Sequence, residues 1–574
     1  MKSSVNYWTL FPSHHPFRVS PEDATILRPG NPALTNNDTS DNTLPGNLGK
    51  SNPSFHVILP ARHATPELAR LLTSAMILNY PPPTLVGYGK PLPEGSTEYD
   101  AMVESVKEVY TYLESSGHVD DQNFVLVLDG VDFFFQLPAE VMVRRFQSLM
   151  RETNAKLRKK YGMIVVDSPD ANAAPELMQK YSQRVLFGAS KTCLVNHNMT
   201  QDPGCVTVPQ SSLPPDVYGW KTDVDSEVGN NRPRWLNPSM VMGQAADVKP
   251  VFAQILQVVQ EEQRKEQQYR QQQQQRQKHN KYTKRRDSID FRVALTQMYG
   301  RQEYIRELER SRSSNAFMQL MYYMIGISDA SNITGAIPPS LTPGSRYEYG
   351  MGVDSQSHVF FDMAYSHRDM EWLHYSNATR SSLVQMEHCV PREHRLLLPT
   401  DLLNAHVANP FYHPNLTKEE QTKANPPYNA TLDFLPNYKV HSYHSMPLLT
   451  TVRTPSVPAL VRVDGDRLAK DGSWKRMWYS PWARALLRRY MRMPLEFDAA
   501  QAALLGGQDW WDLRGGKGGV WTDLGQWLGF EEVCRGFERD IFEDGFGAWG
   551  KEFGESNDGP VYNQFGNLVK GKEG

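Results

Sequence analysis

The stretch NFVLVLDGVDFFFQLP (Asn123–Pro138) runs an apolar segment into two aspartates and then returns to apolar residues. The five apolar residues Phe124–Leu128 predict a buried β-strand. Asp129 and Asp132 follow that strand at once, with two residues between them. Two interpretations are open. The carboxylates are solvated or cap the next turn, or they belong to a site for a metal ion and phosphate.

The elements before this stretch decide the fold class. Apolar runs predict strands at Phe55–Leu59 and at Thr84–Gly89, and apolar spacing predicts helices over Leu68–Met76 and Tyr99–Ser115. Strands that alternate with helices are typical of an α/β fold, in which helical crossovers join parallel strands. Ligands of such sheets bind beyond the carboxyl ends of the strands, where Asp129 and Asp132 are expected.

The rest of the chain suggests one large domain with appendages. A helix over Ala139–Tyr161 and a strand over Met163–Asp167 continue the α/β pattern. Residues 1–53 are rich in Pro, Asn, Ser, Thr and Gly and predict a disordered arm or stem. The Gln-rich segment 257–286 ends in basic residues and reads as a solvated helix or a disordered insertion. Residues 495–574 predict a helix followed by a small C-terminal cap.

Composition excludes several classes of protein. The net charge of -3 gives no general attraction to nucleic acid, and no apolar run is long enough for a transmembrane helix. Four cysteines are too few for a disulfide scaffold, although Cys193 and Cys205 can close a small loop in an oxidising compartment. Six N-x-S/T sequons favour a glycoprotein of the secretory lumen, at Asn37, Asn198, Asn332, Asn377, Asn415 and Asn429. We expect the ER or Golgi lumen if a signal or anchor precedes this chain.

The order of several segments resembles the glycosyltransferase module of the procollagen lysyl hydroxylase/glycosyltransferase family, and more closely its fungal glycosyltransferase-like relatives. The similar segments include HVILPAR, SVKEVYTYL, LVLDGVDFFFQLP, RPRWLNPSMVMGQAADV and GMGVDSQSHVFF. The last of them is a long segment that ends in RALLRRY, and together they span about residues 54–494. Each is weak alone, and their common order carries the resemblance.

The resemblance implies a GT-A fold, with a Rossmann-type nucleotide-binding half joined to an acceptor half. It implies transfer of a sugar from a nucleotide sugar, with UDP as the expected nucleotide, to a hydroxyl of a protein or glycan. In the family a D-x-D or D-x-x-D pair holds Mn²⁺ or another divalent cation against the donor diphosphate. Asp129 and Asp132 match that pair, and carboxylate oxygens suit such a hard cation.

Further donor contacts follow only from the resemblance. Lys107 corresponds to a lysine that contacts the diphosphate, against the alternative of a solvated helix lysine. Asn237 and Ser239 fall where the family has L-N-S-G beside the donor sugar, but Pro238 interrupts that pattern. Asp287 and Asp290 lie near the family's catalytic acids, and the alternative for both is a helix N-cap.

One departure from the family's pattern affects the expected metal site. The family's last metal ligand is a histidine in V-H-x-N-G, and this chain has Arg462 there, with Asp464 in place of the asparagine. Arginine cannot ligate a cation, but it can pair with a phosphate. Asp464 can supply a carboxylate ligand instead. Weak metal binding, metal-free activity and loss of catalysis all stay open.

Two other functions compete with an active glycosyltransferase. The first is an inactive relative that binds a nucleotide sugar or a glycan. The second is an iron/2-oxoglutarate dioxygenase, since His367, Asp369, His444 and Arg453 crudely follow the order H-x-D, H, R. That chemistry requires the ligands on a double-stranded β-helix, and the surrounding sequence lacks the alternating strands.

Overall fold

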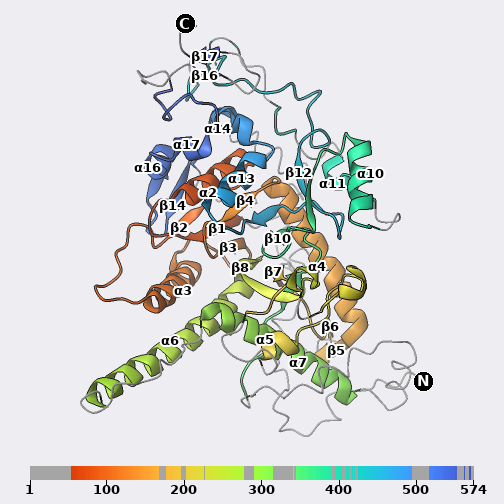
Figure 1. Cartoon of the computed structure of the whole chain (residues 1–574). Coiled ribbons are helices and arrows are strands. Elements are labelled where there is room, and N and C mark those ends of the chain that lie inside the picture. The colour runs from red at the N-terminus through yellow and green to blue at the C-terminus, as the bar shows by residue number, and fades with distance from the viewer. Residues whose placement is uncertain are drawn as a thin grey trace, which may run out of the picture.

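The computed structural model describes much of the chain between residues 54 and 570 (Figure 1). The described residues are 54–166, 176–194, 202–224, 227–276, 290–313, 341, 344–390, 395–403, 409–412, 417, 419, 424–493, 516–552, 561–562 and 568–570. The expected arm of residues 1–53, Asp287, and the sequons at Asn37, Asn198, Asn332 and Asn415 lie outside them.

A mixed eight-stranded sheet forms the centre of the molecule, in the order β15-β14-β2-β1-β3-β8-β7-β9 (Figure 1). Four neighbouring pairs are parallel, and three are antiparallel. The strands are β1 (Phe55–Pro60), β2 (Thr84–Val86), β3 (Phe124–Leu128), β7 (Val185–Ser190), β8 (Trp235–Gln244), β9 (Met351–Asp354), β14 (Gly519–Thr522) and β15 (Trp527–Gly529).

The first three strands form a Rossmann-like unit. Helix α2 (Pro66–Ile77) joins β1 to β2, and α3 (Glu98–Ser115) joins β2 to β3. Because β2 and β3 pair with opposite edges of β1, the order of the strands reverses between β1 and β3. Such a switch point opens a crevice beyond the carboxyl ends of its two strands. Asp129 directly follows β3 and therefore stands at the carboxyl end of one of these two strands.

Local sequence explains where these helices begin and end. The Thr65 side chain caps α2, which starts at a proline. Thr97 and Asp100 form a capping box at the start of α3. Helix α4 (Ala139–Tyr161) stops at Gly162, whose positive φ of 81° suits glycine.

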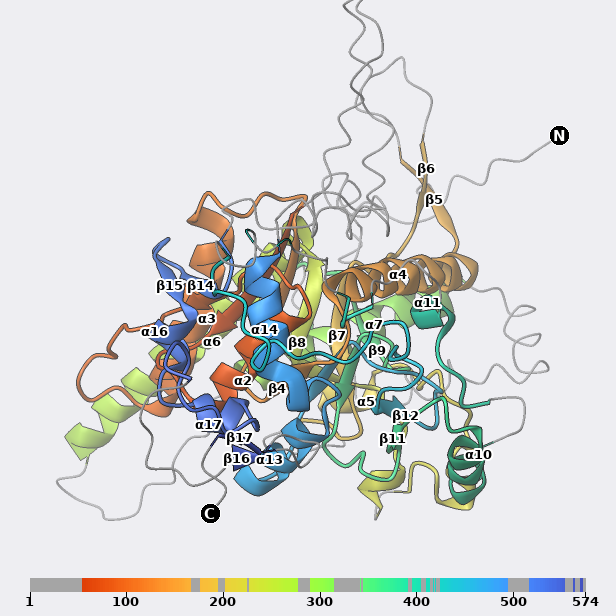
Figure 2. The same ribbon diagram turned by 90° about the horizontal axis from the view of Figure 1, so that it is seen from above.

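Helices cover both faces of the central sheet. The α2 face is packed by α4, α13 (Arg467–Arg476) and α14 (Ala483–Arg492) in one apolar cluster. The opposite face is packed by α3, α6 (Ala245–Arg276) and α7 (Phe291–Ser313) in a second cluster. Figure 1 shows α13 and α14 above the strands and α3 and α6 below them, and Figure 2 views the molecule from above, from the side of α2 and α14. The fold is thus a layered α/β structure with a core on each face of its sheet.

A second, three-stranded sheet adjoins the site. It has the order β10-β13-β4, with β10 (Phe360–Asp362) parallel to β13 (Leu460–Arg462) and β4 (Phe133–Phe135) antiparallel to it. The remaining elements are β5 (Met163–Val166), β6 (Glu176–Gln179), α5 (Pro203–Val206), η2 (Gly219–Lys221), η3 (Val228–Asn230), β11 (Met370–Leu373), α10 (Ala378–Glu387), α11 (Thr400–Leu403), β12 (Leu448–Thr451), η4 (Ser480–Trp482), α16 (Phe530–Cys534), α17 (Glu538–Ile541), β16 (Val561–Tyr562) and β17 (Leu568–Lys570).

The structure confirms the expected α/β class, and its central sheet is compatible with a Rossmann-like fold. One expected continuation is wrong. The strand that follows α4, β5, does not join the central sheet but pairs antiparallel with β6 in a separate hairpin. No helix among the described residues is long and apolar enough to cross a membrane.

Candidate functional site

The turn after β3 joins the central sheet to the small sheet. The backbone N–H of Asp129 donates to the carbonyl of Ser239 on β8 at 2.9 Å, which continues the sheet pairing for one residue. Gly130 then takes a φ of 114°, a conformation that side chains other than hydrogen disfavour. The carbonyl of Asp132 accepts from the N–H of Val463 at 2.8 Å. Both aspartates are partly buried and fixed by backbone bonds on either side.

Arg462 lies in the small sheet beside this turn. It is the last residue of β13, the middle strand, and stands directly opposite Asp362 on one side and Phe133 on the other. Residues directly opposite in a sheet project from the same face. The Nη1 atom of Arg462 lies 3.3 and 3.5 Å from the two carboxylate oxygens of Asp362. The guanidinium is therefore held beside Asp362, with its side chain about 31% exposed.

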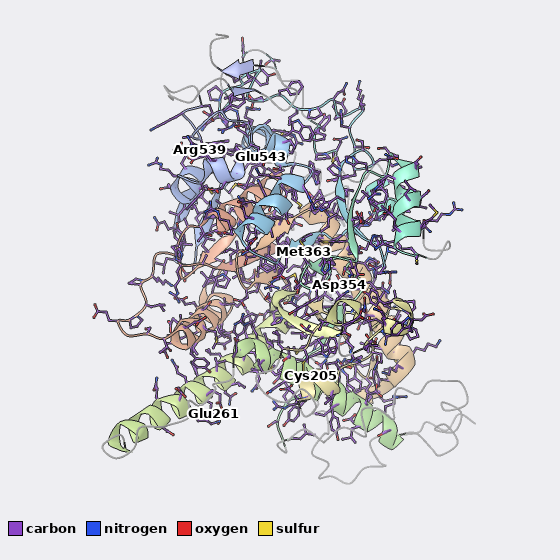
Figure 3. The ribbon with its side chains drawn as sticks, viewed as in Figure 1. Cys205, Glu261, Asp354, Met363, Arg539 and Glu543 are labelled. Atoms are coloured by element: carbon purple, nitrogen blue, oxygen red, sulfur yellow. A yellow bond between two sulfur atoms is a disulfide. The ribbon has the colours of Figure 1, made fainter. Side chains whose placement is uncertain are left out.

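Asp362 connects Arg462 to the start of β8. Its Oδ2 accepts from the amide of Asn237 at 2.7 Å, and its Oδ1 accepts from the N–H of Ala364 at 3.0 Å. Asn237 in turn accepts from the N–H of Ser239 at 3.0 Å. Burial raises the pKa of Asp362, and Arg462 opposes that rise. Met363, the next residue, lies near the middle of the molecule in Figure 3.

A lysine reaches the second aspartate of the pair. The Nζ atom of Lys470, on the first turn of α13, lies 2.7 Å from Oδ1 of Asp132. The link from β13 to this helix turns at Gly465, with a φ of 109°, and Asp466 caps the helix. Asp464, on the same link, is exposed to solvent.

The start of α7 brings a further pair of charges toward Asp129. Asp290 and Arg292 form a close ion pair, with Nη2 2.6 Å from Oδ2. Burial raises the pKa of Asp129. Arg292 opposes that rise, Asp290 adds to it, and Arg462 opposes it. Asp290, Arg292 and Arg462 thus lie within electrostatic reach of Asp129.

The sequence predicts Asp129, Asp132, Asn237, Ser239, Asp290 and Arg462 as site residues. The structure brings these six residues to the edge of the central sheet where β3 ends. Lys107 differs, because it is exposed in the middle of α3 and its Nζ pairs with Glu104 at 3.0 Å. Asp287 lies outside the described residues. Asp362, Lys470 and Arg292 were missed. Only Asp362 carried a visible signal, since it ends the apolar run HVFFD as Asp129 ends FVLVLD.

The side chains as they stand do not fit a divalent cation. No group of three or more His, Cys, Asp or Glu in the described part of the chain is arranged to hold a metal ion. Asp132 is engaged by Lys470, and Asp129 faces two arginines. A centre for Mn²⁺ needs several oxygen ligands free to coordinate. The metal that the resemblance implies therefore stays a prediction.

The residues of the dioxygenase alternative form a different structure. Asp369 is buried and bonds Nζ of Lys191, accepts from the hydroxyl of Tyr218 at 2.6 Å, and lies 3.5 Å from Nε of Arg453. His367 and His444 are exposed. The described residues thus give no three-ligand iron centre, and Asp369 serves as an anchor for the surrounding loops.

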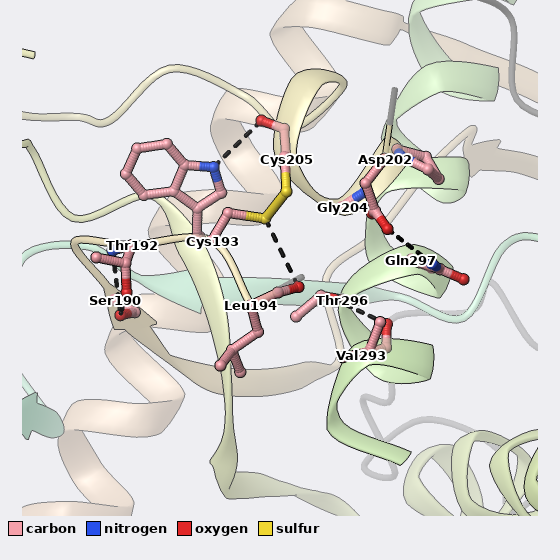
Figure 4. The surroundings of a disulfide bond; sticks show 12 residues. Ser190, Thr192, Cys193, Leu194, Asp202, Gly204, Cys205, Val293, Thr296 and Gln297 are labelled. Atoms are coloured by element: carbon pink, nitrogen blue, oxygen red, sulfur yellow. Dashed lines mark hydrogen bonds between the residues drawn. A yellow bond between two sulfur atoms is a disulfide. The ribbon is translucent and has the colours of Figure 1, made fainter. Parts of the chain in front are cut away.

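A disulfide ties the end of β7 to α5. Cys193 and Cys205 are bonded, and both are buried. The carbonyl of Cys205 accepts from the indole of Trp235 at 3.2 Å, and Asp202 accepts from Gln297 on α7 at 2.7 Å (Figure 4). Helix α5 packs closely on α7, since a Cβ placed on Gly300 would fall 2.0 Å from the carbonyl oxygen of Pro203. The bond therefore braces the helix whose start carries Arg292.

No protein-family model matches the chain, and a search of curated proteins finds no similar sequence.

Proposed function

We propose that the protein is a glycosyltransferase with a GT-A-like fold, which transfers a sugar from a nucleotide sugar to a hydroxyl of a protein or glycan. The observation that carries the proposal is the position of Asp129 and Asp132. They stand at the carboxyl end of β3, next to the switch point of the sheet, with Arg462 beside them. Nucleotides bind at this position in open α/β sheets.

The charges near this turn suit a diphosphate leaving group. When the bond between sugar and nucleotide breaks, negative charge grows on the phosphate oxygens, and cations placed there stabilise it. Arg462 offers a planar guanidinium for two parallel bonds to phosphate, and Lys470 offers a point charge. Both cations now pair with carboxylates, so the donor has to compete with Asp362 and Asp132 for them.

Turnover of UDP-sugars by the purified chain tests this proposal, with a panel of sugars and with and without Mn²⁺. We expect Asp129→Ala and Asp132→Ala each to lower the release of UDP by at least about 100-fold, as expected for a group that acts at the reacting phosphate. The matched control is Asp120→Ala, which removes an exposed aspartate ahead of β3, at the opposite end of the strand from Asp129. It should retain most of the wild-type rate.

Turnover that survives both substitutions would remove the donor site from this turn. Melting temperatures of all variants separate loss of chemistry from loss of the fold. Mass spectrometry of acceptor mixtures would show whether the sugar is transferred to protein or glycan, or only to water.

A second function rests on the ion pairs of the site. Asp132 with Lys470, Asp362 with Arg462 and Asp290 with Arg292 already satisfy one another. This pairing favours a relative that binds a nucleotide sugar without turning it over. Equilibrium binding of UDP-sugars without any release of UDP would support this second function.

A further inference from the structure

The carboxyl ends of β1 and β2 carry a second charged network, separate from the Asp129 turn. Nη2 of Arg62 lies 3.0 Å from Oε2 of Glu108 on α3, and Nη1 lies 3.3 Å from the carbonyl of Lys90. The ammonium of Lys90 pairs with Oδ2 of Asp523. Two cations and two carboxylates therefore alternate along this part of the sheet edge.

Asp523 comes from the C-terminal part of the chain. Strand β14 extends the central sheet beside β2, and the pairing Trp521↔Thr84 is parallel. The N–H of Asp523 donates to the carbonyl of Leu85 at 3.0 Å, so the residue directly follows the strand at its carboxyl end. A segment more than 400 positions away in the sequence thus supplies a carboxylate to the edge where β1 and β2 end.

One oxygen of that carboxylate has no hydrogen-bond partner in the part of the chain that the structure describes. The Asp523 side chain is only 9% exposed. Its Oδ2 accepts from Lys90 and, at 3.4 Å, from the N–H of Gly87. Its Oδ1 is buried and accepts no hydrogen bond from any described residue. A buried acceptor left unsatisfied is destabilising, so a bound hydrogen-bond donor is expected there.

The backbone turn at Gly87 lies close to both Asp523 and Glu108. Gly87 has a φ of 77°, and a Cβ there would lie 2.4 Å from Oε2 of Glu108. The N–H of Gly89 donates to the carbonyl of Arg62 at 2.9 Å, which draws the turn toward β1. Glu108 and Asp523 therefore lie against the same glycine, with no side chain of residue 87 between them.

We propose that Asp523, with Glu108 as a second acceptor, binds the ribose hydroxyls of the nucleotide. A carboxylate that follows β14, beside the carboxyl end of β2, is suited to a vicinal diol, because each oxygen accepts from one hydroxyl. The nucleoside would lie over β1 and β2 while its diphosphate points across the switch point toward Asp129. The C-terminal segment would then complete the donor site. This inference rests on the proposed nucleotide-sugar function.

Calorimetric titration of UDP against its 2′-deoxy and 3′-deoxy forms tests the assignment on the full chain. The wild-type protein should prefer UDP to at least one deoxy form by about tenfold or more, since the deoxy form loses a hydrogen bond to a charged group. Asp523→Asn keeps the shape and removes the charge, and it should reduce that preference to about threefold or less. Glu531→Gln, an exposed change in the same segment, is the control and should leave the preference unchanged.

The outcomes separate this inference from the proposed function. If wild-type protein binds no UDP, the nucleotide-sugar function fails and the ribose site fails with it. If it binds UDP and both deoxy forms equally, only the ribose site is overturned. A preference that survives Asp523→Asn would also overturn it. The wild-type comparison needs no variant, so it decides the matter even if Asp523→Asn does not fold.

Discussion

Arg462 is the residue that most affects the chemistry expected of the proposed site. In the resembled family a histidine ligates a metal at this position, whereas here a guanidinium lies beside Asp362 and within electrostatic reach of Asp129. An arginine repels a divalent cation and attracts a phosphate. The arginine in place of the family's histidine therefore alters both the charge and the ligand set of the proposed donor site.

The exchange of Arg462 gives a direct prediction on nucleotide binding. Arg462→Ala should weaken UDP binding by about tenfold or more, because a charge-assisted hydrogen bond to phosphate is lost. Arg462→His should bind UDP more tightly when Mn²⁺ is added, since it adds a ligand to Asp129 and Asp132. Titration of UDP with Mn²⁺ or with chelator measures both effects.

Two controls keep this result interpretable. Arg467→Ala removes a more exposed arginine five residues later, with a side chain 69% exposed, and should not change UDP affinity. Asp362→Asn tests whether the loss comes only from a stranded buried carboxylate, because it removes that charge and leaves Arg462 in place. A wild-type affinity that rises strongly with Mn²⁺ would contradict the assigned role of Arg462.

The residues of the site were predictable to different degrees. Asp129 and Asp132 stood out because an apolar run ended in carboxylates, and a short linear motif needs no tertiary information. Lys470 and Arg292 gave no such signal, since each reaches the site from a helix whose placement depends on packing. Lys107 is the opposite case. The resemblance predicts that it contacts the diphosphate, but the structure pairs it with Glu104 on its own helix.

At the scale of elements, helices were easier to predict than the partners of strands. The expected helix over 139–161 matches α4, because its period and its flanking Pro138 and Gly162 are local signals. Strand β5 was expected where it occurs, but its partner was not. An apolar run of four residues does not say which sheet it joins. The position of β14 next to β2 likewise depends on contacts distant in sequence.

The disulfide between Cys193 and Cys205 gives a prediction on thermal stability. It closes a loop between Cys193 and Cys205, 12 residues apart, and a bond over such a loop contributes roughly 3 kcal/mol to the free energy of unfolding. Cys193→Ser with Cys205→Ser should lower the melting temperature by several degrees. Hydrogen exchange should also rise at the start of α7, because α5 packs on that helix.

Cys389 provides the matched control. It is exposed and has no disulfide partner, so Cys389→Ser should leave the melting temperature unchanged. Wild-type protein denatured without reductant should show two reactive thiols, from Cys389 and Cys534. Four reactive thiols in that sample would show that the bond does not form.

The C-terminal segment, residues 516–552, is part of the main core. Val520 on β14 is fully buried, and α16 and α17 pack in the same apolar cluster as β1 and α2. The ion pairs of Arg70 with Asp471 and Asp540 add a polar link between these parts. Residues 516–552 therefore cover the edge of β2, which would otherwise be free to pair with another chain.

The integration of this segment predicts a global effect from one distant change. Val520→Asp places an unpaired charge in the core and should destabilise the protein by about 4 kcal/mol or more. Because β2 would lose its neighbour, the variant should also aggregate on mild heating. Leu524→Asp is the control, since its side chain lies in the exposed turn between β14 and β15, and it should melt as the wild type does. If Val520→Asp loosened only residues 516–552 in hydrogen exchange, while β1–β3 kept full protection, the segment would be an independent appendage. It could then not hold Asp523 rigidly at the carboxyl edge of the sheet.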